Sequence, residues 1–159
     1  MTTTGNFRSN ELLAHENDCL LPLITNSEAL AIGQLATQIG LERNLPIAIE
    51  VRIGDWVVYK AALPGSKLEN DGWIARKANV VNLTGHSTMY ERVKSEEDLI
   101  DWHAIHGVED ATHAIHGGGF PLSTSDGLKG ILLISGLPQV EDHLLAVEII
   151  KSYLQNPVG

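Results

Sequence analysis

Apolar and polar residues alternate along the chain with two periods, and the period distinguishes predicted helices from predicted strands. Helical spacing or capping signals predict helices at residues 9–17, 26–43, 70–85, 86–103 and 138–154. Short apolar or β-branched runs predict strands at 19–25, 46–54, 55–63, 119–124 and 129–136. Pro22 places the first of these strands at a sheet edge. The order predicts an α+β fold, in which an antiparallel sheet of five strands has helices packed on it.

Local signals mark where several of these elements begin and end. Thr25 and Glu28 have the spacing of a capping box, in which a hydroxyl and an acid three residues later cap a helix start. Gly54-Asp55 indicates the turn of a hairpin. Gly85 is typical of a helix C-cap. Ser95, followed by three acids, predicts a second helix start inside a polar stretch that we expect to form a surface excursion.

Length and charge narrow the class of protein. The chain has 159 residues and a mass of 17.3 kDa, which predicts one domain spanning residues 1–159. Its formal charge is -9, without a basic run, and this disfavours nucleic acid and anionic membranes as partners. Neither a secretory signal nor an apolar run of membrane-spanning length is evident, so we expect a cytoplasmic protein. The single cysteine, Cys19, fits a reducing compartment and is expected to be a buried, inert thiol.

The pentapeptide His-Ala-Ile-His-Gly occurs at residues 103–107 and again at 113–117. Two imidazoles three residues apart converge on one metal ion from a helix, but not from a strand. His103 and His106 fit the end of a helix, whereas the second copy runs into three glycines that stop one. We therefore expect no local metal pair at His113 and His116. For His103, His106 and His113, solvent-facing or core positions are the favoured interpretation.

His116 differs from the other three because glycines at 117–119 follow it. Their unhindered N–H groups let a ligand or a neighbouring chain approach the backbone, so His116 could line a site. A tight turn that enters a strand explains the same pattern equally well. Neither a dinucleotide-binding nor a phosphate-loop motif occurs.

Two further clusters carry side chains capable of chemistry. Trp73 and Lys77 share a predicted helical face with Arg76 beside them, as in a site for an anion or a planar ligand. An amphipathic helix with exposed bases is the alternative. His143 follows Asp142 at the start of the last helix, but helical neighbours diverge by about 100°, so adjacency alone predicts no catalytic dyad.

Three motifs in order resemble the UPF0303 family, a branch of the GlcG and HbpS-like proteins, also known as haem-degrading or haem-binding domains (DUF336). They are NDGWIARKANVV with GHS at 70–87, HGGGFPL at 116–122 and ISGLPQVEDHLLAVE at 134–148. The resemblance covers roughly residues 10–155. It implies a profilin-like fold with helices on both faces of a five-stranded antiparallel sheet, and a homo-oligomer. The UPF0303 branch implies no settled activity, and fold alone is a weak guide to function.

Three functions remain open from the sequence. The first is an oligomeric binding protein whose pocket takes haem or another small anionic or planar ligand. Its candidate ligand-binding residues are Arg76, Lys77, His86, His116, Gly117, Gly118, Gly119 and His143. The second is a scaffold without a ligand, in which the motifs stabilise subunit contacts. The third is an enzyme of the haem-degrading type, with His116 or His143 as acid or base.

Overall fold

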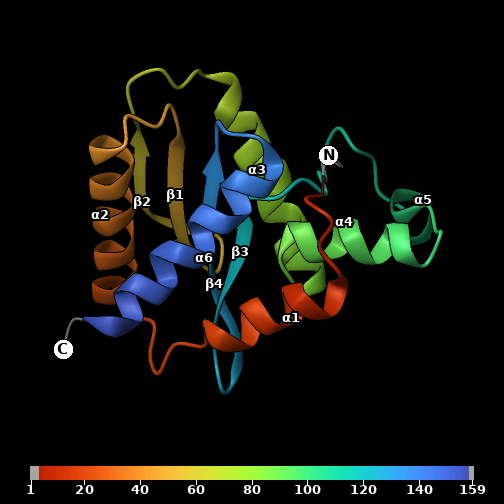
Figure 1. Ribbon diagram of the computed structural model, residues 1–159, viewed down its shortest axis with the longest axis horizontal. Helices are drawn as coiled ribbons and strands as arrows, with labels where there is room; N and C mark the ends of the chain where they lie inside the picture. The colour runs from red at the N-terminus through yellow and green to blue at the C-terminus, as the bar shows by residue number, and fades with distance from the viewer. Residues whose placement is uncertain (1–3, 158–159) are drawn as a thin grey trace.

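The computed structural model describes residues 4–157. Its helices are α1 (Ser9–Asp18), α2 (Asn26–Glu42), α3 (Glu69–Thr84), α4 (Thr88–Glu97), α5 (Trp102–His106) and α6 (Gln139–Gln155), and its strands are β1 (Ala48–Ile53), β2 (Trp56–Ala62), β3 (Gly119–Thr124) and β4 (Gly127–Ser135) (Figure 1). No helix within residues 4–157 is long and apolar enough to cross a membrane.

The four strands form one antiparallel sheet with the order β2-β1-β4-β3. Each outer strand pairs with a central strand through a short turn, and β1 pairs with β4 across the middle of the sheet. The α+β class is therefore confirmed, but the expected number of five strands is wrong for the part of the chain that the structure describes.

The predicted strand at residues 19–25 is the element that does not form. One backbone hydrogen bond, from Leu21 N to Ser123 O, links this segment to β3. Pro22 has no N–H to continue a ladder, and Thr25 already caps α2. The apolar character of the segment reflects burial instead, since Cys19 and Leu21 both lie in the main hydrophobic core.

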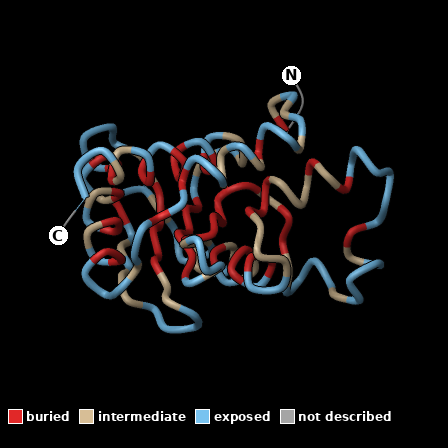
Figure 2. The backbone as a smooth tube through the Cα atoms, turned by 90° about the horizontal axis from the view of Figure 1, so that it is seen from below, coloured by how far each residue is buried: buried red, intermediate tan, exposed pale blue. Residues whose placement is uncertain are grey.

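Helices cover both faces of the sheet. The face made by Ile49, Val51 and Leu132 packs against α2 and α6 and forms the main core. On the other face, Ile131 and Leu133 pack against α3. Figure 2 shows buried positions running through the centre of the molecule, whereas the segment around α5 is mostly exposed.

Most predicted boundaries are confirmed. Thr25 and Glu28 make both bonds of the capping box at α2, and Gly85 ends α3 in the left-handed conformation, with φ 75°. The polar stretch after Gly85 divides into α4 and α5, and the expected helix start at Ser95 is wrong. Ser95 lies inside α4, where its hydroxyl donates to the Arg92 carbonyl. The N-cap of α4 is Ser87 instead, whose Oγ accepts from the Tyr90 N–H.

Cys19 is buried, as expected. Burial is the main cause that raises the pKa of its thiol to about 11. The neutral thiol is neither a nucleophile nor a metal ligand, so Cys19 acts as a small apolar side chain in the core.

Candidate functional site

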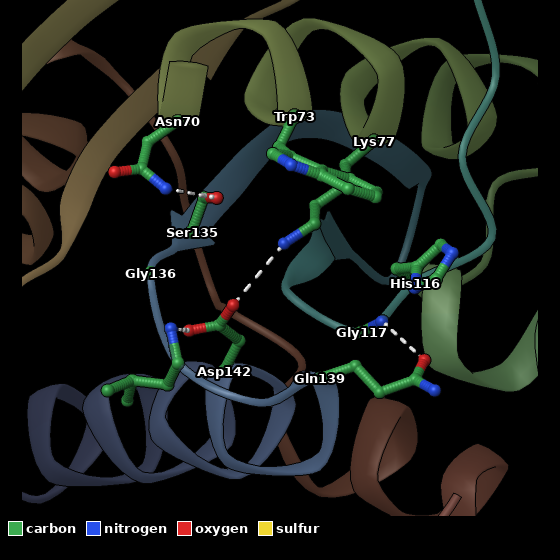
Figure 3. A pocket seen from close by; sticks show the side chains of 10 residues that line it. Asn70, Trp73, Lys77, His116, Gly117, Ser135, Gly136, Gln139 and Asp142 are labelled. Carbon is green, nitrogen blue, oxygen red and sulfur yellow. Dashed lines mark hydrogen bonds and ion pairs between the residues drawn. The ribbon is translucent and has the colours of Figure 1, made fainter. Parts of the chain in front are cut away.

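A pocket of about 260 Å³ lies where α3, the end of β4 and the start of α6 meet the segment that precedes β3 (Figure 3). Asn70, Trp73 and Lys77 line it from α3, because spacings of three and four residues place them on one helical face. The remaining lining residues are His116, Gly117, Ser135, Gly136, Leu137, Gln139 and Asp142. Polar side chains thus surround a concave site that opens to solvent.

A buried ion pair forms one wall of this pocket. The side chains of Lys77 and Asp142 are 3 % and 2 % exposed, and Lys77 Nζ lies 3.4 Å from Asp142 Oδ2. Lys77 Nζ also donates to the Ile134 carbonyl at 2.9 Å. Asp142 Oδ1 accepts from the Leu137 N–H at 3.1 Å, which fixes the carboxylate beside the turn between β4 and α6.

Burial acts on both charges of this pair. It lowers the pKa of Lys77, although Asp142 opposes the shift. It raises the pKa of Asp142 to about 6, against the attraction of Lys77 and a hydrogen bond from Leu137. Both shifts favour uncharged groups, so a neutral amine beside a carboxylic acid is more accessible here than in water.

Aromatic rings form the wall next to the ion pair. The rings of Trp73 and His116 meet edge to face, with centroids 4.9 Å apart. Burial is the largest cause that lowers the pKa of His116, and Arg92 and Lys77 add to it. His116 is therefore a neutral imidazole at pH 7, the form that binds metal ions.

The glycines after His116 are required by close packing. A Cβ on Gly117 would lie 2.2 Å from the Gln139 carbonyl oxygen. On Gly118, which has φ +129°, it would lie 2.7 Å from Lys77 Nζ and 2.2 Å from a backbone carbonyl. Gly119 N donates to Thr88 Oγ1 at 3.0 Å. Gly117 lines the pocket, whereas Gly118 and Gly119 are not among its lining residues.

Three further predicted site residues, besides Gly118 and Gly119, do not line the pocket. The Arg76 guanidinium stacks on the Trp73 ring at 4.3 Å but forms an ion pair with Asp110 outside the pocket. His86 Nδ1 lies 3.0 Å from Glu16 Oε1 of α1, and this hydrogen bond is the largest cause that raises the pKa of His86. His143 is fully buried, and its Nε2 is 3.0 Å from His15 Nδ1.

Apart from His116, the histidines of the repeated pentapeptide make local contacts. His103 Nε2 lies 2.7 Å from the His113 carbonyl oxygen, and the His106 ring stacks on Trp102 with centroids 4.2 Å apart. Within residues 4–157, no three His, Cys, Asp or Glu side chains are grouped so that they could hold a metal ion.

Sequence reasoning missed Asn70, Ser135 and Gln139 as pocket residues. Asn70 could have been found from its spacing to Trp73 and Lys77 on the same helix. Its Nδ2 donates to Ser135 Oγ at 3.2 Å. Ser135 carries no local signal, because its place in the pocket depends on how β4 meets α3.

The chain is similar to known proteins over almost its whole length. The family model described as haem degrading protein HbpS-like matches residues 24–151. A UPF0303 protein from Streptomyces avermitilis is 36% identical over 148 residues, which are 92% of this chain and 91% of that protein.

Two solved structures extend the comparison. The crystal structure of Ybr137w protein superposes with a TM-score of 0.85 at 29% identity, covering 94% of this chain and 90% of that one. The PduOC:heme complex superposes with a TM-score of 0.67 at 16% identity over 81% of this chain and 93% of that one, which shows a shared fold. By its match to the family model and its identity to the UPF0303 protein, this chain belongs to the HbpS-like family.

Proposed function

We propose that this protein binds a small planar or anionic ligand in the pocket between α3 and α6, and that haem is the first ligand to test. The observation that carries the proposal is His116, a neutral imidazole on the pocket wall, in contact with the Trp73 ring. An aromatic ring can stack on a planar ligand, and an imidazole can be an axial ligand of iron. The HbpS-like family is described as haem degrading, and PduOC forms a complex with haem, which supports the choice of ligand.

The size of the pocket limits how haem would be held. About 260 Å³ is slightly below the roughly 300–1,000 Å³ typical of pockets that bury most of a drug-sized ligand. The lining therefore fits one part of a porphyrin. His116 would hold the iron and Trp73 would contact the ring, while the rest would lie in solvent or against another subunit. Bound haem would supply an iron centre for ligand exchange or electron transfer.

Titration of the purified protein with haemin, followed through the Soret band, tests this proposal. We expect a saturable, stoichiometric shift that His116→Ala abolishes. The matched control is His106→Ala, which removes an exposed histidine outside the pocket and should bind as the wild type does. An unchanged titration of His116→Ala would contradict the assignment of the site, and a wild type without a saturable shift would remove haem as the ligand.

Self-association belongs to the same proposal. Trp56, on the edge strand β2, is 64% exposed, and Leu68 and Leu99 are even more so. Tryptophan is enriched at protein–protein interfaces, and a second subunit could complete the shallow pocket. Light scattering on the eluting protein should give a multiple of the 17.3 kDa chain mass. A mass of one chain at micromolar concentration would contradict self-association.

An acid or base role for His143 in this pocket has no support. Its ring is fully buried, outside the residues that line the cavity, among Phe7, His15 and Phe120.

A further inference from the structure

Lys77 occupies an unusual position for a lysine. Its side chain is 3 % exposed, yet it forms part of the pocket wall. The amine points from α3 toward Asp142, with Trp73 on one side and the glycine segment on the other (Figure 3). Lysine is almost never fully buried unless it is paired, and a buried lysine at a cavity is a group whose reactivity differs from that on the surface.

Asp142 is placed to exchange a proton with this amine. Its Oδ2 lies 3.4 Å from Lys77 Nζ, and its Oδ1 is held by the Leu137 N–H. Transfer of one proton from the ammonium to the carboxylate leaves the net charge of the wall unchanged and replaces two buried charges by two neutral groups. Burial shifts the pKa of both groups in the direction of this transfer. The products are a nucleophilic amine and a carboxylic acid, as covalent amine catalysis requires.

We propose that Lys77 captures a small carbonyl compound as an imine, with Asp142 carrying the protons. This activity goes beyond ligand binding and does not depend on haem.

Imine formation needs no reagent other than the carbonyl compound, because its atoms, protons and electron pairs balance. The neutral amine attacks the carbonyl carbon, a C–N bond forms, and the amine proton passes to the former carbonyl oxygen to give a carbinolamine. The Asp142 carboxylic acid then protonates the hydroxyl group, which leaves as water while the nitrogen lone pair forms the C=N bond. The resulting protonated imine lies beside the Asp142 carboxylate, so each proton and electron pair is accounted for.

The pocket also indicates the class of carbonyl compound. A cavity of about 260 Å³, slightly smaller than the pockets that bury drug-sized ligands, favours a small molecule beside the amine. Asn70, Ser135 and Gln139 offer amide and hydroxyl groups around Lys77, and these groups can hydrogen-bond a substrate hydroxyl. A small hydroxyaldehyde satisfies both conditions.

Reductive trapping tests the proposal on the native protein. Glycolaldehyde and cyanoborohydride would be added in limiting amount, and the modified lysines would be located by peptide mass spectrometry. The chain has five other lysines, all exposed or partly exposed: Lys60, Lys67, Lys94, Lys129 and Lys151. If access alone controlled labelling, these five would react first and Lys77 last. We expect Lys77 to be modified several-fold faster than any of them in the native protein, and at the same rate as the others after unfolding in urea.

The comparison of native with unfolded wild type needs no variant, so it holds even if substitution of Lys77 prevents folding. If the Lys77→Met variant folds, the rapid labelling should be absent, while the five other lysines should react as they do in the wild type. Labelling of native Lys77 no faster than the five other lysines would overturn the proposal and leave the Lys77–Asp142 pair as a purely structural contact. Neither the reagents nor the readout involve haem, so a negative haemin titration and a negative trapping result are distinguishable.

Discussion

Acid should destabilise this protein through one buried histidine. His143 has no exposed surface, its Nε2 is 3.0 Å from His15 Nδ1, and its Nδ1 has no partner within residues 4–157. The neutral ring has only one N–H to place, and His15 Nδ1 can accept it from His143 Nε2. A protonated ring would bring a second N–H, at Nδ1, into a site formed partly by Phe7 and Phe120, where no acceptor is present in the described residues.

The sign and size of the effect follow from proton binding. Burial lowers the pKa of His143 to about 3, from 6.5 in the unfolded chain. The unfolded state therefore binds the proton more tightly, and the stabilisation is complete above pH 6.5 and lost as the pH falls toward 3. At pH 5 the pH lies about 1.5 units below the unfolded pKa, which corresponds to a loss of about 2 kcal/mol relative to pH 8. Burial and Lys151 also lower the pKa of His15, against Asp18 and Glu11, so His15 adds a loss of the same sign.

Urea unfolding at pH 8 and pH 5 measures this loss. His143→Phe keeps a ring of similar size but cannot take up a proton, so it should lose about 2 kcal/mol less than the wild type over this range. Protein concentration must be held fixed, because association would add a concentration-dependent term. His106→Ala, which removes an exposed histidine, is the control and should retain the wild-type loss. Equal losses for the wild type and His143→Phe would refute the reasoning.

Three further predictions concern the pocket and the first part of the fold. Asp142→Leu and Lys77→Met should each lower the free energy of unfolding in urea by about 3–5 kcal/mol, because each leaves a buried charge unpaired. The double variant should recover most of this stability. Additive losses in the double variant would contradict the coupling of the two side chains. Gly118→Ala should lower the unfolding free energy by several kcal/mol, measured by thermal unfolding, because its Cβ would overlap backbone and Lys77 Nζ; an unchanged melting temperature would contradict the packing. Thr25→Ala should cost about 1 kcal/mol in chemical denaturation, since it removes half of the capping box with Glu28, and Thr25→Ser should restore most of that stability if the hydroxyl is responsible.

The elements that local spacing predicted are those whose stabilising contacts are also local. The capping box at Thr25 and the C-cap at Gly85 involve residues within four positions of each other, and the structure contains both. The strand predicted at residues 19–25 does not form. Apolar composition alone cannot distinguish a paired strand from a coil that is buried against α6. Cys19 illustrates the difference, since its thiol faces the Val147 carbonyl of that helix rather than a neighbouring strand.

The candidate site shows the same limit over longer distances. Lys77 and His116 were selected from their motifs, and the fold brings both to one pocket. Arg76 has the same sequence context as Lys77, yet it turns to Asp110, a partner 34 positions away. His86 likewise bonds Glu16 of α1, 70 positions earlier. Such pairs depend on how helices pack, so no spacing within a motif can reveal them.

The strand order β2-β1-β4-β3 has a consequence for the order of folding. Each outer strand pairs with its sequence neighbour, and hairpins of this kind form in about 1–10 μs. The β1–β4 pairing instead has to close a loop that contains β2, α3, α4, α5 and β3, and such non-local pairing slows folding. The pocket needs α3, β4 and α6 together, so it should be among the last features to form. A partly folded chain that held both hairpins without the β1–β4 pairing would therefore lack this pocket.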